Sequence, residues 1–135
     1  MGIVAIEHVQ LAMPHGGEDQ ARRFYCGVLG MDEVPKPEHL VVGGGCWFIA
    51  GGAEIHLGVE AEFRPSRKAH PALLLDDLNE QVAQLAAHGY DFIPGKPLAG
   101  YIRGDTHDPF GNRIELMQAV GVDARQEMER ASREG

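Results

Sequence analysis

The chain contains the segment GAEIHL at residues 52–57 and a related segment, GNRIEL, at residues 111–116, an offset of 59 residues. Gly30 and Gly89, each expected just after the end of a helix, share the same offset. Glycine is favoured at that position because it readily adopts the positive φ that commonly ends a helix. An internal duplication is the simplest explanation of these repeated features.

Both halves are predicted to have the order strand, helix and three strands, written βαβββ. In the first half the patterns predict a strand at 3–13, a helix at 18–29 and strands at 31–42, 46–50 and 54–59. In the second half they predict a strand at 69–75, a helix between Asp77 and Gly89, and strands at 90–93, 101–105 and 113–118. Asp77, followed three residues later by Glu80, is the capping signature of that helix.

These patterns predict an α+β protein built as a single domain. A chain of 135 residues can bury one core, but it is too short for two domains of ordinary size. We expect the domain to cover residues 1–120, with unit one at about 2–60 and unit two at about 67–118. Residues 121–135 form a charged, helix-prone tail that we expect to be loosely attached.

The strands that open and close each unit carry one residue that can bind a metal, flanked by apolar neighbours. These residues are His8, His56, His70 and Glu115. Because side chains alternate along a strand, all four can share one face while their apolar neighbours face the helices. If the two strands of a unit are neighbours, about 4.8 Å apart, their ligands can reach one ion. Each residue taken alone could instead be an ordinary side chain of a half-buried strand.

Imidazole and carboxylate groups suit zinc or another first-row transition metal, such as Ni, Fe, Co or Mn. Calcium and magnesium prefer sites made of oxygen ligands alone. The four residues therefore predict a divalent transition metal as the cofactor.

The sequence resembles the vicinal oxygen chelate superfamily, which includes glyoxalase I, bleomycin-resistance proteins and extradiol dioxygenases. The resemblance covers about residues 3–118 and rests on IEHVQL at 6–11, ARRFY at 21–25, AHP at 69–71 and DPFGNRIE at 108–115. It implies that the two units form a half-barrel cleft, with metal ligands from the first and last strand of each unit. His56 departs from glyoxalase I-like enzymes, which usually have an acidic residue there.

The resemblance implies a metal-dependent enzyme of the lyase or isomerase type. The ion would chelate two neighbouring oxygens of a small substrate and stabilise an oxyanion or enolate, with Glu115 as the catalytic base. One alternative is a metal-free, drug-sequestering protein of the bleomycin-resistance type. Another is an Fe(II) extradiol dioxygenase, although a third histidine counts against a site of two histidines and one carboxylate.

Four residues are candidates for contact with the substrate: Trp47, Arg67, Tyr101 and Arg103. Trp47 and Phe48 are successive, so one of them must face the cleft side of the sheet. Arg67 belongs to a basic cluster between the two units, which could hold an anionic substrate or simply form a solvated linker. Tyr101 and Arg103 alternate on one strand face and could line the cleft.

Charge and composition exclude some partners. The net charge of −8 and pI near 5.3 argue against nucleic acid, which requires a basic surface. No apolar stretch approaches the eighteen or so residues of a membrane span. Two cysteines and an N-terminus without a signal-peptide pattern predict a cytoplasmic protein. We expect a homodimer, because the superfamily commonly pairs units across chains and a free sheet edge invites pairing.

Overall fold

The computed structural model describes residues 1–121, which form two four-stranded mixed sheets with one helix against each. Unit one contains β1 (Val9–Met13), α1 (Glu18–Tyr25), β2 (Asp32–Val34), the short 3₁₀ helix η1 (Glu38–Gly43), β3 (Cys46–Ala50) and β4 (Ala53–Val59). Unit two contains β5 (Ala72–Leu74), α2 (Leu78–Ala87), β6 (Ile93–Pro94), β7 (Tyr101–His107) and β8 (Arg113–Ala119). The α+β prediction with two βαβββ-like units is confirmed.

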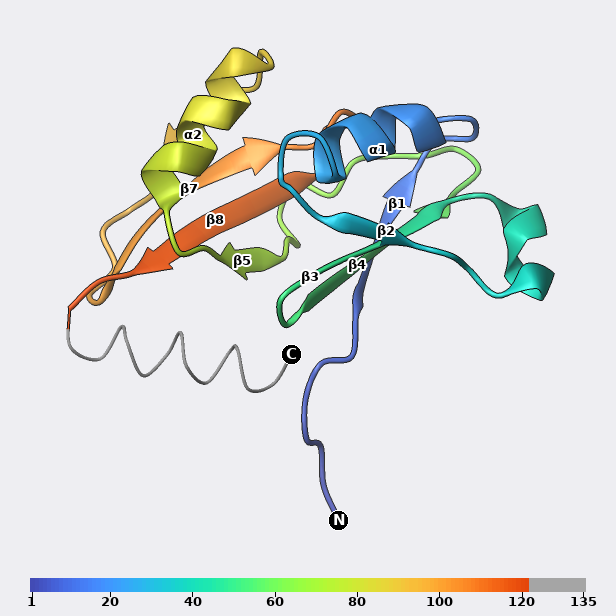
Figure 1. Ribbon diagram of the computed structural model, residues 1–135, viewed down its shortest axis with the longest axis horizontal. Coiled ribbons are helices and arrows are strands. Elements are labelled where there is room, and N and C mark those ends of the chain that lie inside the picture. Colours follow the sequence, from blue (N-terminus) through green and yellow to red (C-terminus); the bar gives the residue numbers. More distant parts are fainter. Residues whose placement is uncertain (122–135) are drawn as a thin grey trace.

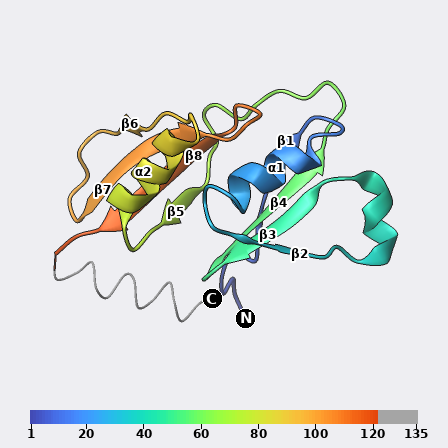
Figure 2. The same ribbon diagram turned by 45° about the horizontal axis from the view of Figure 1, so that its top comes forward.

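The two sheets have the same topology. Their strand orders are β1-β4-β3-β2 and β5-β8-β7-β6, and the first strand of each unit lies parallel to its last strand. Gln10 lies opposite His56 in the first pair, and Ala72 lies opposite Glu115 in the second. His56 and Glu115 therefore lie on the closing strands. His8 immediately precedes β1 and His70 lies two residues before β5, so both lie outside the opening strands, contrary to the sequence prediction. Figure 1 shows α1 and α2 above the two sheets, and Figure 2 shows each helix lying along its own sheet.

The first strand is shorter than the sequence predicts. Pairing begins only at Val9, which lies opposite Ile55, while β4 itself starts at Ala53. Most of residues 1–8 therefore extend past the end of their neighbouring strand and have no backbone partner there. This segment leaves the body of the protein as an extended arm (Figure 1).

Buried apolar side chains face the helices in both units. The fully buried set includes Phe24 and Tyr25 from α1, Leu85 from α2, and Ile55, Leu57, Ile114 and Leu116 from the two closing strands. Burial of each such side chain stabilises the fold by about 1.5 to 3 kcal/mol. Because Ile55 and Leu57 point into this core, His56 between them must point to the opposite face.

Contacts between the units join α1 and β1 to the turn before β8. The Tyr25 hydroxyl donates to Asp108 Oδ2 at 2.7 Å, and Asn112 Nδ2 donates to the Ala12 carbonyl at 2.8 Å. Gly17 precedes α1 at this contact, and a Cβ there would lie 2.7 Å from the Phe110 ring. Glycine thus permits the close approach of the two units.

The second helix is capped as predicted, with Asp77 Oδ1 accepting from the Glu80 amide at 3.0 Å. The first helix ends at Tyr25, earlier than predicted, because the amides of Gly27 and Leu29 bond to carbonyls five residues back, those of Arg22 and Phe24, and the α-helical pattern is broken. In the described residues, no helix is long and apolar enough to cross a membrane. The predicted tail at 121–135 lies outside the described residues from 122 onward.

Candidate metal centre

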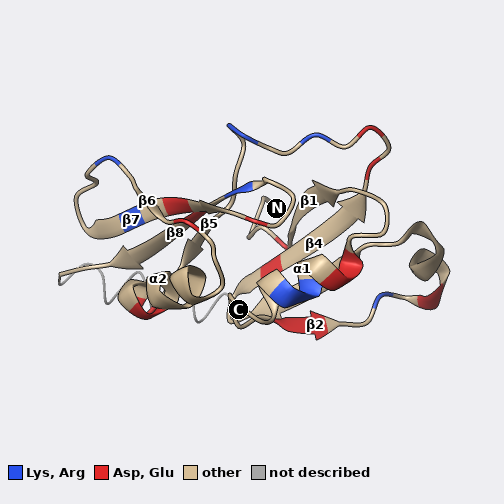
Figure 3. Ribbon diagram, turned by 90° about the horizontal axis from the view of Figure 1, so that it is seen from above, with Lys and Arg blue, Asp and Glu red and all other residues tan. Residues whose placement is uncertain are grey.

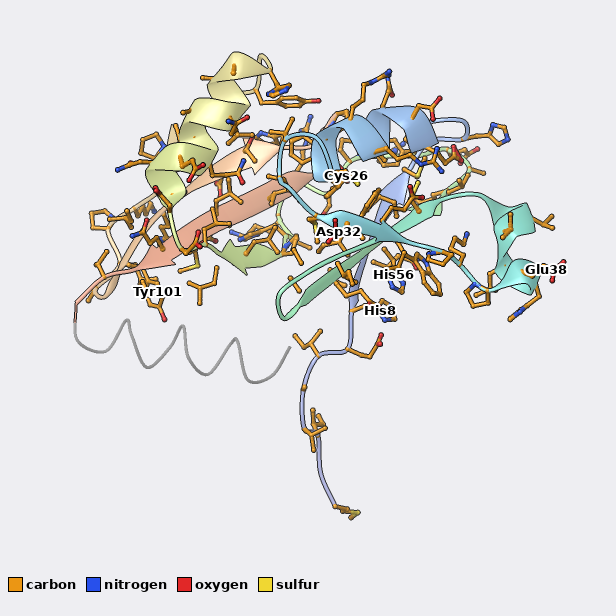
Figure 4. The ribbon with its side chains drawn as sticks, in the orientation of Figure 1. His8, Cys26, Asp32, Glu38, His56 and Tyr101 are labelled. Atoms are coloured by element: carbon orange, nitrogen blue, oxygen red, sulfur yellow. The ribbon has the colours of Figure 1, made fainter. Side chains whose placement is uncertain are left out.

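The first half of the site is a stack of three aromatic rings on the face of unit one opposite the helices. The His56 ring lies between Trp47, at a centroid distance of 4.1 Å, and His8, at 4.0 Å. His56 is 4% exposed, because Trp47 and His8 cover its two sides. Figure 4 shows His8 and His56 side by side below the sheet. Trp47 is therefore the member of the Trp47–Phe48 pair that faces the site, while Phe48 lies in the core.

Glu54 joins this half of the site, and sequence reasoning did not select it. Its Oε2 lies 2.8 Å from His56 Nε2. Among residues 1–121, His8, Glu54 and His56 form the only group of three or more potential ligands whose donor atoms all lie within 4.8 Å of one another. The sequence feature that could have identified Glu54 is the alternation of side chains in β4, because residues two apart on a strand, such as Glu54 and His56, lie on the same face.

The second half of the site is an ion-paired cluster on unit two. His70 Nε2 lies 2.9 Å from Glu115 Oε1, and Arg103 Nη1 donates to Glu115 Oε2 at 3.2 Å. Burial of the Glu115 carboxyl raises its pKa, but the hydrogen bonds from His70 and Arg103 outweigh this effect and leave its pKa below the ordinary value. Glu115 is therefore a carboxylate at neutral pH, which is the form that binds metals.

His70 is oriented with Nε2 toward the Glu115 carboxylate, so that either a proton or a metal ion can lie between the two groups. Its Nδ1 lies 2.7 Å from the Lys68 carbonyl oxygen, which can only accept a hydrogen bond, so Nδ1 carries a proton. In the neutral ring Nε2 then holds a lone pair directed at the Glu115 carboxylate. Two acceptors at this distance repel each other unless a proton or a metal ion lies between them. A backbone carbonyl on the second nitrogen is also the usual partner of a metal-binding histidine.

The four predicted ligands lie as two pairs beside one pocket. His8, Glu54 and His70 all line this pocket, which has a volume of about 370 Å³ and lies between β1 and β4 on one side and β5 on the other. His56 contacts His8, and Glu115 contacts His70. The structure thus brings together the members of each pair, whereas the His70–Glu115 pair is not part of the compact group around His56.

The donor types fit a transition metal, but one ring must turn before both histidines of unit one can bind it. A metal lies in the plane of each imidazole that coordinates it, about 2.0 to 2.1 Å from the nitrogen. The His8 and His56 rings are stacked with an interplanar angle of 12°, so their lone pairs do not converge. His8 is the residue that can turn, because its side chain is 39% exposed and it precedes the first paired residue of β1.

The other predicted residues divide into those near the site and those away from it. Arg103 contacts Glu115 directly, and Trp47 contacts His56. Tyr101 lies at the far end of β7, away from both histidines of unit one (Figure 4). Arg67 is exposed in the connection between β4 and β5.

Two paired βαβββ-like units, with histidine and carboxylate side chains on the face opposite the helices, define the class of protein. The family model for the Glyoxalase/Bleomycin resistance protein/Dioxygenase superfamily matches residues 5–116. The chain belongs to this superfamily, which confirms the resemblance seen in the sequence.

Solved structures are similar over nearly the whole chain. A protein from Bacillus anthracis assigned to the glyoxalase family is 45% identical, with a TM-score of 0.85 over 89% of this chain and 98% of that one. The fosfomycin resistance protein FosX from Listeria monocytogenes is 14% identical, with a TM-score of 0.71 over 92% of this chain and 99% of that one. A superfamily member from Sphaerobacter thermophilus is 19% identical, with a TM-score of 0.67 over 85% and 98% of the two chains. The search of curated proteins finds no match.

Proposed function

We propose that this protein is a metal-dependent, glyoxalase-type lyase or isomerase acting on a small substrate with two neighbouring oxygens. The observation that carries the proposal is the His70–Glu115 pair, in which Nε2 and a carboxylate oxygen face each other at 2.9 Å while Nδ1 is fixed by a carbonyl. Superfamily membership supports the same proposal. We place the reaction in the cytoplasm, where thiols such as Cys26 and Cys46 stay reduced.

In this proposal His8, His56, His70 and Glu115 hold a divalent transition metal, and Glu54 is an additional donor beside His56. The ion supplies Lewis-acid stabilisation of negative charge on the substrate oxygens. Trp47 and Glu54 fix the plane of the His56 ring, and the Lys68 carbonyl fixes His70. Such second contacts matter because they set the orientation and basicity of the ligand.

Glu115 is also the proposed base that takes a proton from the substrate. Its carboxylate is within hydrogen-bond distance of Arg103 and His70, and both contacts favour the ionised form. A base must be ionised before it can accept a proton, and its strength rises when such contacts are released. Arg103 therefore controls how strongly Glu115 acts as a base.

Replacement of His70 by alanine tests the metal site directly. Loss of a residue that only supports a ligand typically weakens metal affinity about 10- to 100-fold, so loss of a ligand should cost at least that much. Zinc affinity is measured by competition with a chromophoric chelator, with metal content by elemental analysis. His15→Ala, at an exposed position in the loop before α1, is the control and should bind zinc normally. Equal zinc affinity in both variants would reject His70 as a ligand.

We also propose that the protein is a homodimer. Ile3, Val4 and Ile6 in the N-terminal arm are 98%, 94% and 78% exposed, and β1 and β5 lie at free edges of their sheets. Exposed apolar segments and free edges favour pairing with a second chain. A second chain can also bring one ligand pair close to the other.

Sedimentation equilibrium at micromolar concentration should therefore give a mass of about twice 14.7 kDa. Double replacement of Ile3 and Ile6 by serine removes two of the exposed apolar side chains and should shift the equilibrium toward the monomer. A species of 14.7 kDa alone for the unmodified chain would refute the dimer.

A further inference from the structure

A second pocket adjoins Glu115 on the side away from His70, and no role has been assigned to it. It has a volume of about 370 Å³ and is lined by residues of β6, β7, β8 and the loop between β6 and β7. Its charged lining residues are Lys96, Arg103, Asp105, Arg113 and Glu115. Figure 3 shows basic segments on β7 and on the loop before it, in a chain that is acidic overall.

The charges in this pocket are not balanced. Asp105 pairs with Arg113 at 3.1 Å, and Glu115 pairs with Arg103 at 3.2 Å. Over residues 1–121, the Lys96 ammonium has no carboxylate within salt-bridge distance, so the pocket has one excess positive charge. A metal ion bound by Glu115 would share the negative charge of that carboxylate. Metal binding would therefore make the electrostatic potential in the pocket more positive.

Two of the basic groups can form new hydrogen bonds. The Arg103 Nε donates to the Lys96 carbonyl at 3.1 Å, and this hydrogen bond fixes the orientation of the guanidinium group. Arg113 Nε is buried and faces Asp105 Oδ2 at 3.1 Å in the ion pair, although the angles of this contact fall outside hydrogen-bond geometry. Because both guanidinium groups line the pocket, their terminal nitrogens favour a ligand that accepts hydrogen bonds.

We propose that this anion pocket, defined by Lys96, Arg103 and Arg113, binds an oxyanion carried by the substrate, a phosphate or a carboxylate. The inference rests on the proposed function, since Glu115 is the wall shared by the anion pocket and the metal centre. A substrate bound across that wall places its anionic group against the three basic residues and its neighbouring oxygens toward the metal. The pocket thus selects anionic substrates over neutral ones of the same size.

Titration of the full chain with inorganic phosphate, and separately with acetate, tests the anion pocket. Binding is followed by amide NMR shifts, expected at residues 95–96 and 103–105, first in EDTA and then with zinc. Lys96→Gln should weaken the binding of the preferred anion on the order of tenfold, and Lys96→Arg should restore it. Lys96 is exposed, so both variants should fold. Arg23→Gln, which removes an exposed charge from α1, is the control and should bind the anion normally.

The outcomes separate this inference from the proposed function. Anion binding in EDTA that depends on Lys96 supports the pocket even if the protein binds no zinc, in which case the proposed function fails alone. Stronger binding of phosphate or of acetate identifies the group that the pocket prefers. Binding that requires zinc and is unaffected by Lys96→Gln would place the anion on the metal and overturn the inference. Loss of anion binding in Arg67→Gln, and not in Lys96→Gln, would place the anion site on the linker between the units and overturn the inference. The absence of binding of either anion would overturn it as well.

Discussion

Replacement of Glu115 by glutamine is expected to give a folded protein that binds metal weakly and turns over substrate far more slowly. Glutamine keeps the shape of the side chain but loses its negative charge, so it is a poor metal ligand and cannot act as a base. The fold should survive because Glu115 faces the site, whereas its neighbours Ile114 and Leu116 face the core. Loss of a catalytic base costs about a hundredfold to ten-thousandfold in rate.

The measurement separates the two roles of Glu115. Zinc affinity gives its role as a ligand, and turnover at saturating zinc gives its role as a base, while thermal melting verifies the fold. Glu60→Gln is the matched control, because it makes the same change at an exposed position just after β4. Unchanged zinc affinity in Glu115→Gln would remove Glu115 from the ligand set. Unchanged turnover at saturating zinc would keep it as a ligand and reject it as the base.

Much of the site's arrangement follows from strand alternation alone. His56 lies between Ile55 and Leu57, and Glu115 lies between Ile114 and Leu116, so burial of the apolar residues turns the polar ones outward. The repeat correctly predicts that the first and last strands of each unit are neighbours. The same reasoning places one residue of the Trp47–Phe48 pair at the site.

Other features could not be predicted because they depend on contacts outside the repeat. At the offset of 59 residues, Glu54 corresponds to Arg113, so comparison of the units gives no common role for the two residues. The separation of the ligands into two pairs depends on how the units pack, which the strand pattern does not encode. The length of β1 likewise depends on where β4 begins, since an extended segment needs a neighbouring strand to complete its hydrogen bonds.

The junction between the units depends on one buried carboxylate, Asp108, which is 4% exposed. Its Oδ1 accepts from the backbone amides of Phe110 and Asn112, both at 2.9 Å. Its Oδ2 accepts from the Tyr25 hydroxyl at 2.7 Å and from Asn112 Nδ2 at 2.9 Å. Burial raises the pKa of Tyr25, and the nearby Asp108 charge raises it further, so the hydroxyl remains a donor at any physiological pH. All four contacts therefore depend on a single side chain.

Asp108→Ala should destabilise the protein by about 3 kcal/mol or more, because it leaves buried donors from both units without an acceptor. For a chain of this size that corresponds to a fall in Tm of roughly 10 °C, measured by circular dichroism. Tyr25→Phe removes only the hydrogen bond from Tyr25 to Asp108 and should cost about 1 kcal/mol. Asp76→Ala, an exposed acidic position before α2, controls for the change in charge and should melt like the unmodified chain. If Asp108→Ala melts together with Asp76→Ala, this network does not hold the units together, and apolar contacts around Phe24 and Tyr25 must do so instead.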